Sequence, residues 1–201
     1  MNPGYRADDR PPADLKKDNG FKPWYEITDA AVLRQLMEFV AGTRTWANCS
    51  FKPLCEKYRF DFPPSTTSPM GKGAQVLTVT PATFHEWIIR SKDRGPSVST
   101  APEETCGGYA SGRWVYRVNS DDLDVYTWSV AVPGSNVATN ARTPSPCMNS
   151  NNLAVATKLA IKGNFGVKEL SYLYAVTPDQ ISVYKDPQGN VVHGAPLVST
   201  Y

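Results

Sequence analysis

Three separated segments of the chain carry side chains that could bind an anion and stabilise a developing positive charge. Arg6 and Asp8 lie two residues apart in an expected strand, so their side chains share one face. A guanidinium offers paired donors that fit phosphate or carboxylate oxygens. Ser99 and Thr100 lie in a short β-type run, and Glu169 follows much later. Hydroxyls hold a carboxylate in one rotamer, and a carboxylate stabilises positive charge that develops on a ribose.

The first segment extends well beyond the Arg-x-Asp pair. It reads Tyr5-Arg6-Ala7-Asp8-Asp9-Arg10-Pro11-Pro12, and Gly20-Phe21 follows. We expect a strand over 4–8 that the prolines end, because proline lacks the amide that a ladder needs. An isolated Arg-x-Asp is more often a surface ion pair of little energetic value. The whole segment, however, resembles the opening of the cholera toxin, heat-labile enterotoxin and pertussis toxin family of ADP-ribosyltransferases.

This resemblance implies a fold and a substrate. The fold would be an α+β ADP-ribosyltransferase fold, with two packed antiparallel sheets flanked by helices and an NAD+ cleft between them. Residues 1–201 would form one catalytic domain, with 43–76 as an insertion. NAD+ would be a substrate gripped by Arg6, with Ala7 and Asp8 in the same site and no metal. Asp9 replaces a small polar residue that is common in the family, and we interpret it as a tolerated change.

The triplet Ser99-Thr100-Ala101 resembles the Ser-Thr-Ser strand of the same family. The resemblance implies that Ser99 orients the catalytic Glu and that Thr100 supports the NAD+ site. The triplet alone is common in strands, and it gains meaning from its place between Arg6 and Glu169. Ala101 lacks the third hydroxyl, so part of the family's support for the site is missing.

The segment Val167-Lys168-Glu169 resembles the family's Glu-x-Glu or Gln-x-Glu motif. The run from Val176 to Ile181 follows at the spacing of the family's Ile-Pro turn. The resemblance makes Glu169 the catalytic residue, bonded to a ribose hydroxyl where it stabilises an oxocarbenium-like charge. The alternative is a solvated Glu on a strand face. Glu169 is the only Glu that follows Glu104 in the chain.

Val167 departs from the family pattern, which has Glu where arginine is modified and Gln in several enzymes with other acceptors. Valine neither accepts a proton nor forms a hydrogen bond. The resemblance implies that the preceding loop, Lys162–Gly166, recognises the acceptor. Phe165 could supply an exposed aromatic contact there, with core packing as an equal alternative. We therefore expect NAD+ cleavage to survive, while transfer to arginine is weak or absent.

Composition narrows the class of protein. The 201 residues carry 21 basic and 19 acidic side chains, and the net charge of +2 gives no strong attraction to nucleic acid or anionic membranes. No apolar run is long enough to span a membrane. The absence of Cys-x-x-Cys and the presence of only two histidines argue against a zinc site.

The four cysteines favour two disulfides in a secreted protein, with free buried thiols as the alternative. The four cysteines permit three pairings; a bond from Cys49 to Cys55 would close a short loop, and one from Cys106 to Cys147 would join two longer segments. No signal peptide precedes Asn2, which predicts either a cytosolic protein or a mature chain with an added Met.

Hydrophobic periodicity and turn residues predict the remaining elements. Thr28 should cap a helix over 29–40, and Pro81 should lie in the first turn of a helix that starts at Thr80. His85 on that helix is expected to be structural, and the five Trp residues to lie in the core, with one stacking on NAD+ as an alternative. The other expectations are an irregular 43–76, strands over 97–100, 113–119, 125–132 and 168–176, a short helix over 153–161, and a last hairpin turning at 186–190.

Three functions fit these observations. The first is a secreted toxin or effector that transfers ADP-ribose from NAD+ to a host protein or nucleic acid, with room for a separate delivery subunit. The second is an NAD+ glycohydrolase without an acceptor, which Val167 favours. The third is a binding protein that no longer catalyses, which Val167 and Ala101 together favour. Transfer of label, free ADP-ribose, and absence of NAD+ binding would distinguish them.

Overall fold

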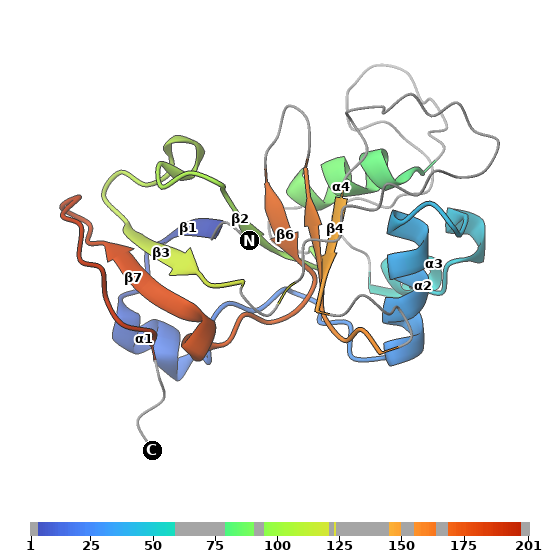
Figure 1. Ribbon diagram of the computed structural model, residues 1–201, viewed down its shortest axis with the longest axis horizontal. Coiled ribbons are helices and arrows are strands. Elements are labelled where there is room, and N and C mark those ends of the chain that lie inside the picture. Colours follow the sequence, from blue (N-terminus) through green and yellow to red (C-terminus); the bar gives the residue numbers. More distant parts are fainter. Residues whose placement is uncertain are drawn as a thin grey trace.

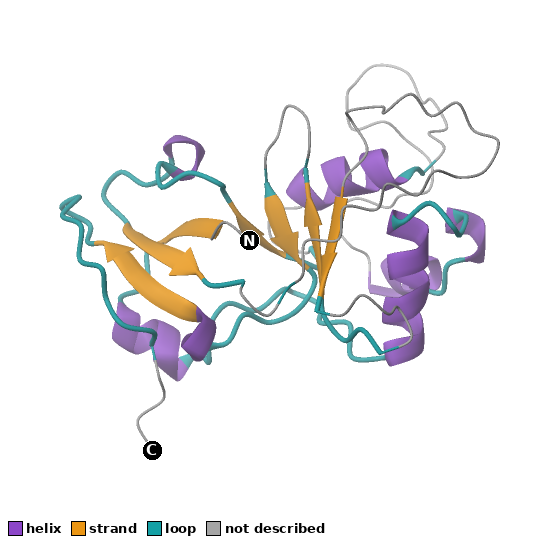
Figure 2. Cartoon of the chain, in the orientation of Figure 1, coloured by secondary structure: helices purple, strands orange, loops and turns teal. Residues whose placement is uncertain are grey.

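The computed structural model describes residues 4–58, 79–90, 95–120, 123, 145–149, 155–163 and 169–197. Over these ranges the chain forms a mixed α+β fold with two antiparallel sheets, as the sequence predicts (Figures 1 and 2). One sheet has the strand order β1 (Gly4–Asp8), β3 (Trp114–Val118), β7 (Ile181–Lys185). The other has the order β2 (Val98–Thr100), β6 (Leu170–Tyr172), β5 (Leu159–Lys162), β4 (Ser145–Met148).

Helices flank the two sheets. The described residues contain four α-helices: α1 (Pro12–Lys17), α2 (Ala30–Val40), α3 (Phe51–Tyr58) and α4 (Pro81–Arg90). In Figure 1, α1 lies beside the three-stranded sheet, while the other three lie on the far side of the four-stranded sheet. No helix in the described part of the chain is long and apolar enough to span a membrane.

Two hydrophobic clusters hold these layers together. The first packs α2, α3 and α4 on the four-stranded sheet through buried residues that include Leu36, Phe51, Phe84 and Leu159. The second joins the two sheets through side chains such as Tyr116 of β3 and Tyr172 of β6, both fully buried. The four-stranded sheet is therefore buried on both faces.

This double burial explains one wrong prediction. Residues 159–162 form β5, whereas the sequence suggested a helix over 153–161. Leu159 and Ile161 face the helices, and Ala160 between them faces the other sheet. A strand buried on both faces reads as a continuous apolar run, which periodicity alone does not separate from a buried helix segment.

The predicted helices over 29–40 and from Thr80 are confirmed as α2 and α4, but the residue that caps α2 differs and the sequence did not predict α3. Asp29, not Thr28, caps α2, because its carboxylate accepts from the amides of Ala31 and Val32 at 2.8 and 3.3 Å. At α4, Thr80 and Thr83 exchange side-chain and backbone hydrogen bonds, with Pro81 in the first turn. The addition is α3, which lies within the stretch expected to be irregular.

Contacts far apart in the sequence explain α3. Gln35 on α2 accepts hydrogen bonds from the amide and hydroxyl of Ser50 at 2.9 and 2.8 Å, immediately before α3 begins. Phe51 is then fully buried in the first cluster. A short segment of this kind is stabilised by tertiary packing rather than by its own propensity.

The C-terminal strands are confirmed, but the expected strand over 168–176 is shorter. The strand observed there, β6, covers residues 170–172 before the chain turns, and Val176 then forms an isolated bridge with Phe21. The turn at Asp186 is confirmed by its hydrogen bonds to Asn190. The expected strand over 125–132 lies outside the described residues.

The expected disulfides are not formed. Cys49, Cys106 and Cys147 are free, buried thiols among the described cysteines. Cys147 lies on β4, in the core between the sheets, whereas Cys106 lies in the connection between β2 and β3. Burial raises the pKa of all three thiols, which disfavours their reactive thiolate form. The prediction of two disulfides is therefore wrong for this structure.

Candidate active site

The two sheets meet where β1 approaches β2. Tyr5 and Ala101 exchange two backbone hydrogen bonds of 2.7 Å each, which form an isolated antiparallel bridge. Gly4 permits this approach, because a Cβ at that position would collide with the side chain of Thr100. The Thr100 hydroxyl is buried and donates to the Leu170 carbonyl at 2.9 Å, so this side chain fixes β2 against β6.

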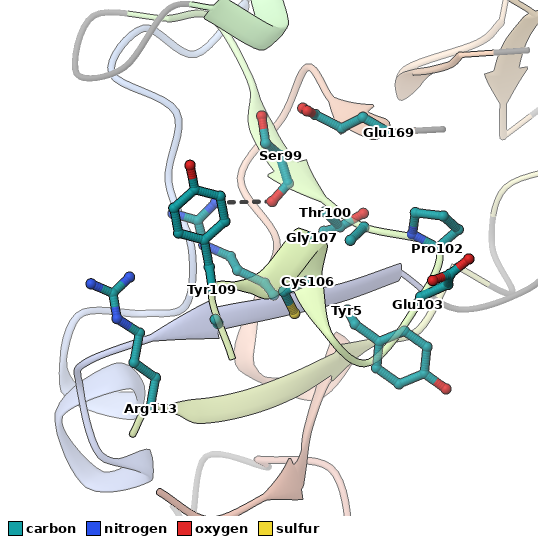
Figure 3. A pocket seen from close by; sticks show the side chains of 13 residues that line it. Tyr5, Ser99, Thr100, Pro102, Glu103, Cys106, Gly107, Tyr109, Arg113 and Glu169 are labelled. Carbon is teal, nitrogen blue, oxygen red and sulfur yellow. Dashed lines mark hydrogen bonds between the residues drawn. The ribbon is translucent and has the colours of Figure 1, made fainter. Parts of the chain in front are cut away.

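A cavity of about 700 Å³ opens at this junction (Figure 3). Arg6, Ala7, Ser99, Thr100 and Glu169 all contribute to its lining. The structure thus brings together five of the residues that the sequence nominated from three distant segments. Asp8 is not among the described residues that line the cavity.

Arg6 lies at the cavity with an incomplete set of partners. Its Nη1 donates to the Ser99 carbonyl at 2.9 Å, and its guanidinium carbon lies 5.0 Å from the centre of the Phe21 ring. Its Nε is buried and has no hydrogen-bond partner among the described residues, with the nearest Asp8 oxygen 3.8 Å away. Burial lowers the pKa of Arg6, which Asp8 partly offsets, yet a guanidinium stays protonated. Arg6 is a cation available to an anionic ligand.

Asp8 is held by Arg10 instead. Arg10 donates from Nε to Oδ1 at 2.8 Å and from Nη2 to Oδ2 at 3.0 Å, and its amide also donates to Oδ1 at 3.0 Å. Burial acts to raise the pKa of Asp8, but these hydrogen bonds outweigh it and leave the pKa below the ordinary value. Asp8 therefore organises the segment behind Arg6 rather than the cavity itself.

Gly20 and Phe21 support both arginines. Gly20 has φ +88°, and a Cβ there would collide with the Val176 carbonyl, so only glycine fits. This close approach lets Phe21 exchange backbone hydrogen bonds of 2.9 and 2.8 Å with Val176. The buried Phe21 ring then lies under Arg6, and under Arg10 at 5.6 Å. Position 20 is thus structural.

Glu169 lies immediately before β6 and is held by hydroxyls from two strands. The register of β2 and β6 places Ser99 opposite Ser171. The Ser171 hydroxyl donates to Glu169 Oε1 at 3.0 Å, and the Ser99 side chain also hydrogen-bonds the carboxylate. Burial raises the pKa of Glu169, and the two hydroxyls and Arg6 counteract the rise. The arrangement gives a shielded carboxylate with a fixed orientation.

Ser171 and His85 were missed by the sequence reading as parts of this site. His85 on α4 is buried, and its Nε2 lies 3.5 Å from the Ser171 hydroxyl, the same hydroxyl that donates to Glu169. Burial lowers the pKa of His85 to about 4, which keeps the ring neutral near pH 7. The Glu-x-Ser spacing could have signalled Ser171, because residues two apart share a strand face. The expectation that His85 is structural agrees with its burial.

The acceptor residues nominated from the sequence, Phe165 and Val167, lie outside the described residues. The ends of that loop are described: the Gly163 amide donates to the Glu169 carbonyl at 2.9 Å. This bond joins Gly163 and Glu169, the two described residues that flank residues 164–168.

Comparisons with known proteins add no family to this geometry. No model of a protein family matches the chain, and neither does any curated protein. Within the described ranges no three His, Cys, Asp or Glu side chains gather as a metal site would require. What the cavity offers is a cation, Arg6, and a shielded carboxylate, Glu169, which together suit an anionic substrate that develops positive charge as it reacts.

Proposed function

We propose that the protein cleaves the nicotinamide–ribose bond of NAD+ and transfers ADP-ribose to a host macromolecule. The observation that carries this proposal is the convergence of Arg6, Ser99 and Glu169, from three distant segments, on one cavity. Each residue was nominated by its place in a separate motif of the toxin family. The two antiparallel sheets that meet at the cavity are compatible with an ADP-ribosyltransferase fold, which we propose as well.

Arg6 would bind the pyrophosphate or the ribose next to it. Its guanidinium is already fixed by the Ser99 carbonyl and the Phe21 ring. The Arg6 side chain is 33% exposed, so terminal N–H groups that the Ser99 carbonyl does not use can donate to ligand oxygens, and a charge-assisted hydrogen bond of this kind is among the stronger ones. Because the cation is positioned before the ligand arrives, little ordering is needed on binding.

Glu169 would act on the ribose of the nicotinamide half. The bond between the ribose C1′ and the nicotinamide nitrogen breaks, and its electron pair leaves with nicotinamide. Positive charge develops on the ribose, and an ionised carboxylate that accepts from a ribose hydroxyl stabilises it. Ser99 and Ser171 fix the carboxylate, and Arg6 favours its ionised form. A nucleophile then bonds to C1′ and releases its proton to solvent.

Water is the second candidate for that nucleophile. Val167 carries no group that could accept a proton from an incoming acceptor. An NAD+ glycohydrolase that depletes NAD+ needs no such group, since water reacts readily with an oxocarbenium-like species. The role of a secreted toxin or effector, with or without a delivery subunit, belongs to the same proposal.

Product analysis of the wild-type chain tests both candidates. Nicotinamide and free ADP-ribose are measured after incubation with NAD+, and label transfer from biotinylated NAD+ is followed in cell extract. ADP-ribose below nicotinamide, with labelled protein or nucleic acid, supports transfer. Equal amounts of nicotinamide and free ADP-ribose, with no labelled macromolecule, support hydrolysis. Release of no nicotinamide under either condition would show that the proposal is wrong.

A further inference from the structure

One wall of the cavity has no counterpart in the motifs described above. The connection between β2 and β3 supplies about half of the residues that line the cavity: Pro102, Glu103, Cys106, Gly107, Tyr109 and Arg113. In Figure 3 this segment carries Tyr109 and Arg113 on the opposite side of Ser99 from Glu169. The cavity therefore continues away from the proposed reaction centre.

The backbone of this wall is tightly turned. Cys106, Gly107 and Gly108 have φ values of +49°, +65° and +94° in succession. Cys106 anchors the turn, since its side chain is buried and accepts a hydrogen bond from the Ala7 backbone on β1. A Cβ at Gly107 would meet no described atom within 4 Å, so the glycine serves the conformation and leaves the wall open. The turn projects the next side chains along the cavity.

Tyr109 is an unusual aromatic residue in this fold. It is 71% exposed, although it lines the cavity, and it belongs to neither hydrophobic cluster of the described residues. Tyr116 and Tyr172, by contrast, are fully buried between the sheets. An exposed aromatic ring at a cavity is suited to stacking on a planar base, because every base has a π-face.

Arg113 adds positive charge beside this ring. Its Nε pairs with Asp9 at 3.1 Å, but the two side chains are 42% and 78% exposed. An exposed pair of this kind is weak, and the guanidinium has further donors. In Figure 3, Glu169, Ser99, Tyr109 and Arg113 follow one another across the view. A carboxylate, a serine side chain, an aromatic ring and a guanidinium thus succeed each other along one cavity.

We propose that Tyr109 and Arg113 form the subsite for the adenosine end of NAD+. Tyr109 stacks on the adenine ring, and Arg113, which lies farther from Glu169, donates to an acceptor nitrogen of the same base. The inference rests on the proposed function, since it assigns the second half of the same substrate. The cavity volume of about 700 Å³ suits a ligand larger than the nicotinamide half alone.

Two half-ligands separate this subsite from the rest of the cavity. ADP-ribose contains the adenosine end, and nicotinamide mononucleotide lacks it. Tyr109→Ala should weaken ADP-ribose binding about 10-fold, the size of effect expected for one lost base stack, and change nicotinamide mononucleotide binding less than about twofold. Tyr109→Phe is the matched control and should keep wild-type affinity for both. Arg113→Gln should weaken ADP-ribose binding severalfold, with a smaller salt dependence than the wild type.

The outcomes distinguish failure of the subsite from failure of the proposed function. Wild-type binding of ADP-ribose that Tyr109→Ala leaves unchanged would overturn the subsite alone. The subsite assignment would also be overturned if Tyr109→Ala lost only label transfer to protein, because Tyr109 would then contact the acceptor. Equal weakening of both half-ligands also contradicts the assignment. If the wild type binds neither half-ligand nor NAD+, the proposed function and the subsite fall together.

Discussion

Arg6 and Arg10 lie close together in the chain, yet they occupy regions of opposite character. Arg10 is fully engaged, with two bonds to the Asp8 carboxylate and one to Asp18 at 2.9 Å. Arg6 has one carbonyl partner and a buried Nε that no described residue satisfies. Hydrogen bonds that Arg10 donates to Asp8 raise the pKa of Arg10, whereas burial lowers the pKa of Arg6. The same Phe21 ring supports both.

The difference shows how a structural cation and a ligand-binding cation can share one short segment. The Asp8 carboxylate accepts its hydrogen bonds from Arg10 and forms only a 3.8 Å ion pair with Arg6. Arg6 therefore keeps donors for a ligand, at some cost in stability, because a buried guanidinium with an unsatisfied Nε is unfavourable. Buried charged groups with perturbed pKa values are common at functional sites.

The largest effect expected from this comparison is on substrate binding. Arg6→Ala should weaken NAD+ binding by about 10- to 100-fold, as the loss of charge-assisted hydrogen bonds predicts. The fold of this variant should persist, because the Arg6 guanidinium donates one hydrogen bond within the described part of the chain. Titration calorimetry with NAD+ and thermal unfolding measure the two properties. Unchanged affinity in this variant would remove Arg6 from the site.

Gly20→Ala tests the platform that both arginines share. The left-handed conformation and the collision with the Val176 carbonyl should together lower the free energy of unfolding by about 2–4 kcal/mol. Displacement of Phe21 should also weaken NAD+ binding. Denaturant unfolding gives the first quantity, and Gly42→Ala is the control, since a Cβ there meets no described atom within 4 Å and its φ is also positive. Equal losses in the two variants would mean that φ alone matters.

Arg10→Ala should lower the stability and leave NAD+ binding nearly unchanged, which is the opposite of the effects expected for Arg6→Ala. It leaves the Asp8 carboxylate, which is 12% exposed, without its main partner. Because the Arg10 side chain is 36% exposed and screened by water, we expect a loss of only about 1–2 kcal/mol. NAD+ affinity should change little if the fold is intact. An affinity loss as large as that of Arg6→Ala, with no loss of stability, would reverse the two roles.

The smallest effect is a shift in the pH profile. Burial raises the pKa of Glu169, so the active carboxylate is present above that pKa and is lost as the pH falls through it. The acidic limb of kcat/KM, which reports the free enzyme, should therefore lie above the ordinary Glu value of about 4.3. Arg6→Gln should move it higher still, because Arg6 favours the ionised form. Arg10→Gln should leave it in place, and a shift there of equal size would contradict the comparison.

The sequence predicted those parts of the molecule that local pattern determines. The strand at 4–8, the helices at 29–40 and from Thr80, and the gathering of Arg6 with Glu169 all depended on periodicity or on ordered motifs. The partner of Asp8 could not be predicted, because Arg6 and Arg10 are both two residues away and only the folded geometry decides between them. The Glu-x-Ser spacing could have indicated Ser171, but the contact of His85 with Ser171 depends on the packing of α4, which no spacing reveals.

The wall at Tyr109 was missed for a related reason. Its form depends on three successive left-handed residues, one of them Cys106, and cysteine has no special preference for that conformation. The sequence predicted that Cys106 forms a disulfide, whereas in the structure it is a free thiol that lines the cavity. Composition likewise could not reveal that β5 is buried on both faces.

The most direct test of the account is the rate of nicotinamide release by Glu169→Gln, measured beside Glu104→Gln. Glu104 is the matched control, because its carboxylate pairs with Lys185 at 2.9 Å and does not belong to the described lining of the cavity. Glu169→Gln should bind NAD+ with near wild-type affinity and release nicotinamide at least about 100-fold more slowly, while Glu104→Gln keeps wild-type turnover. Wild-type turnover in Glu169→Gln would show that Glu169 does not cleave NAD+ and would contradict the central claim.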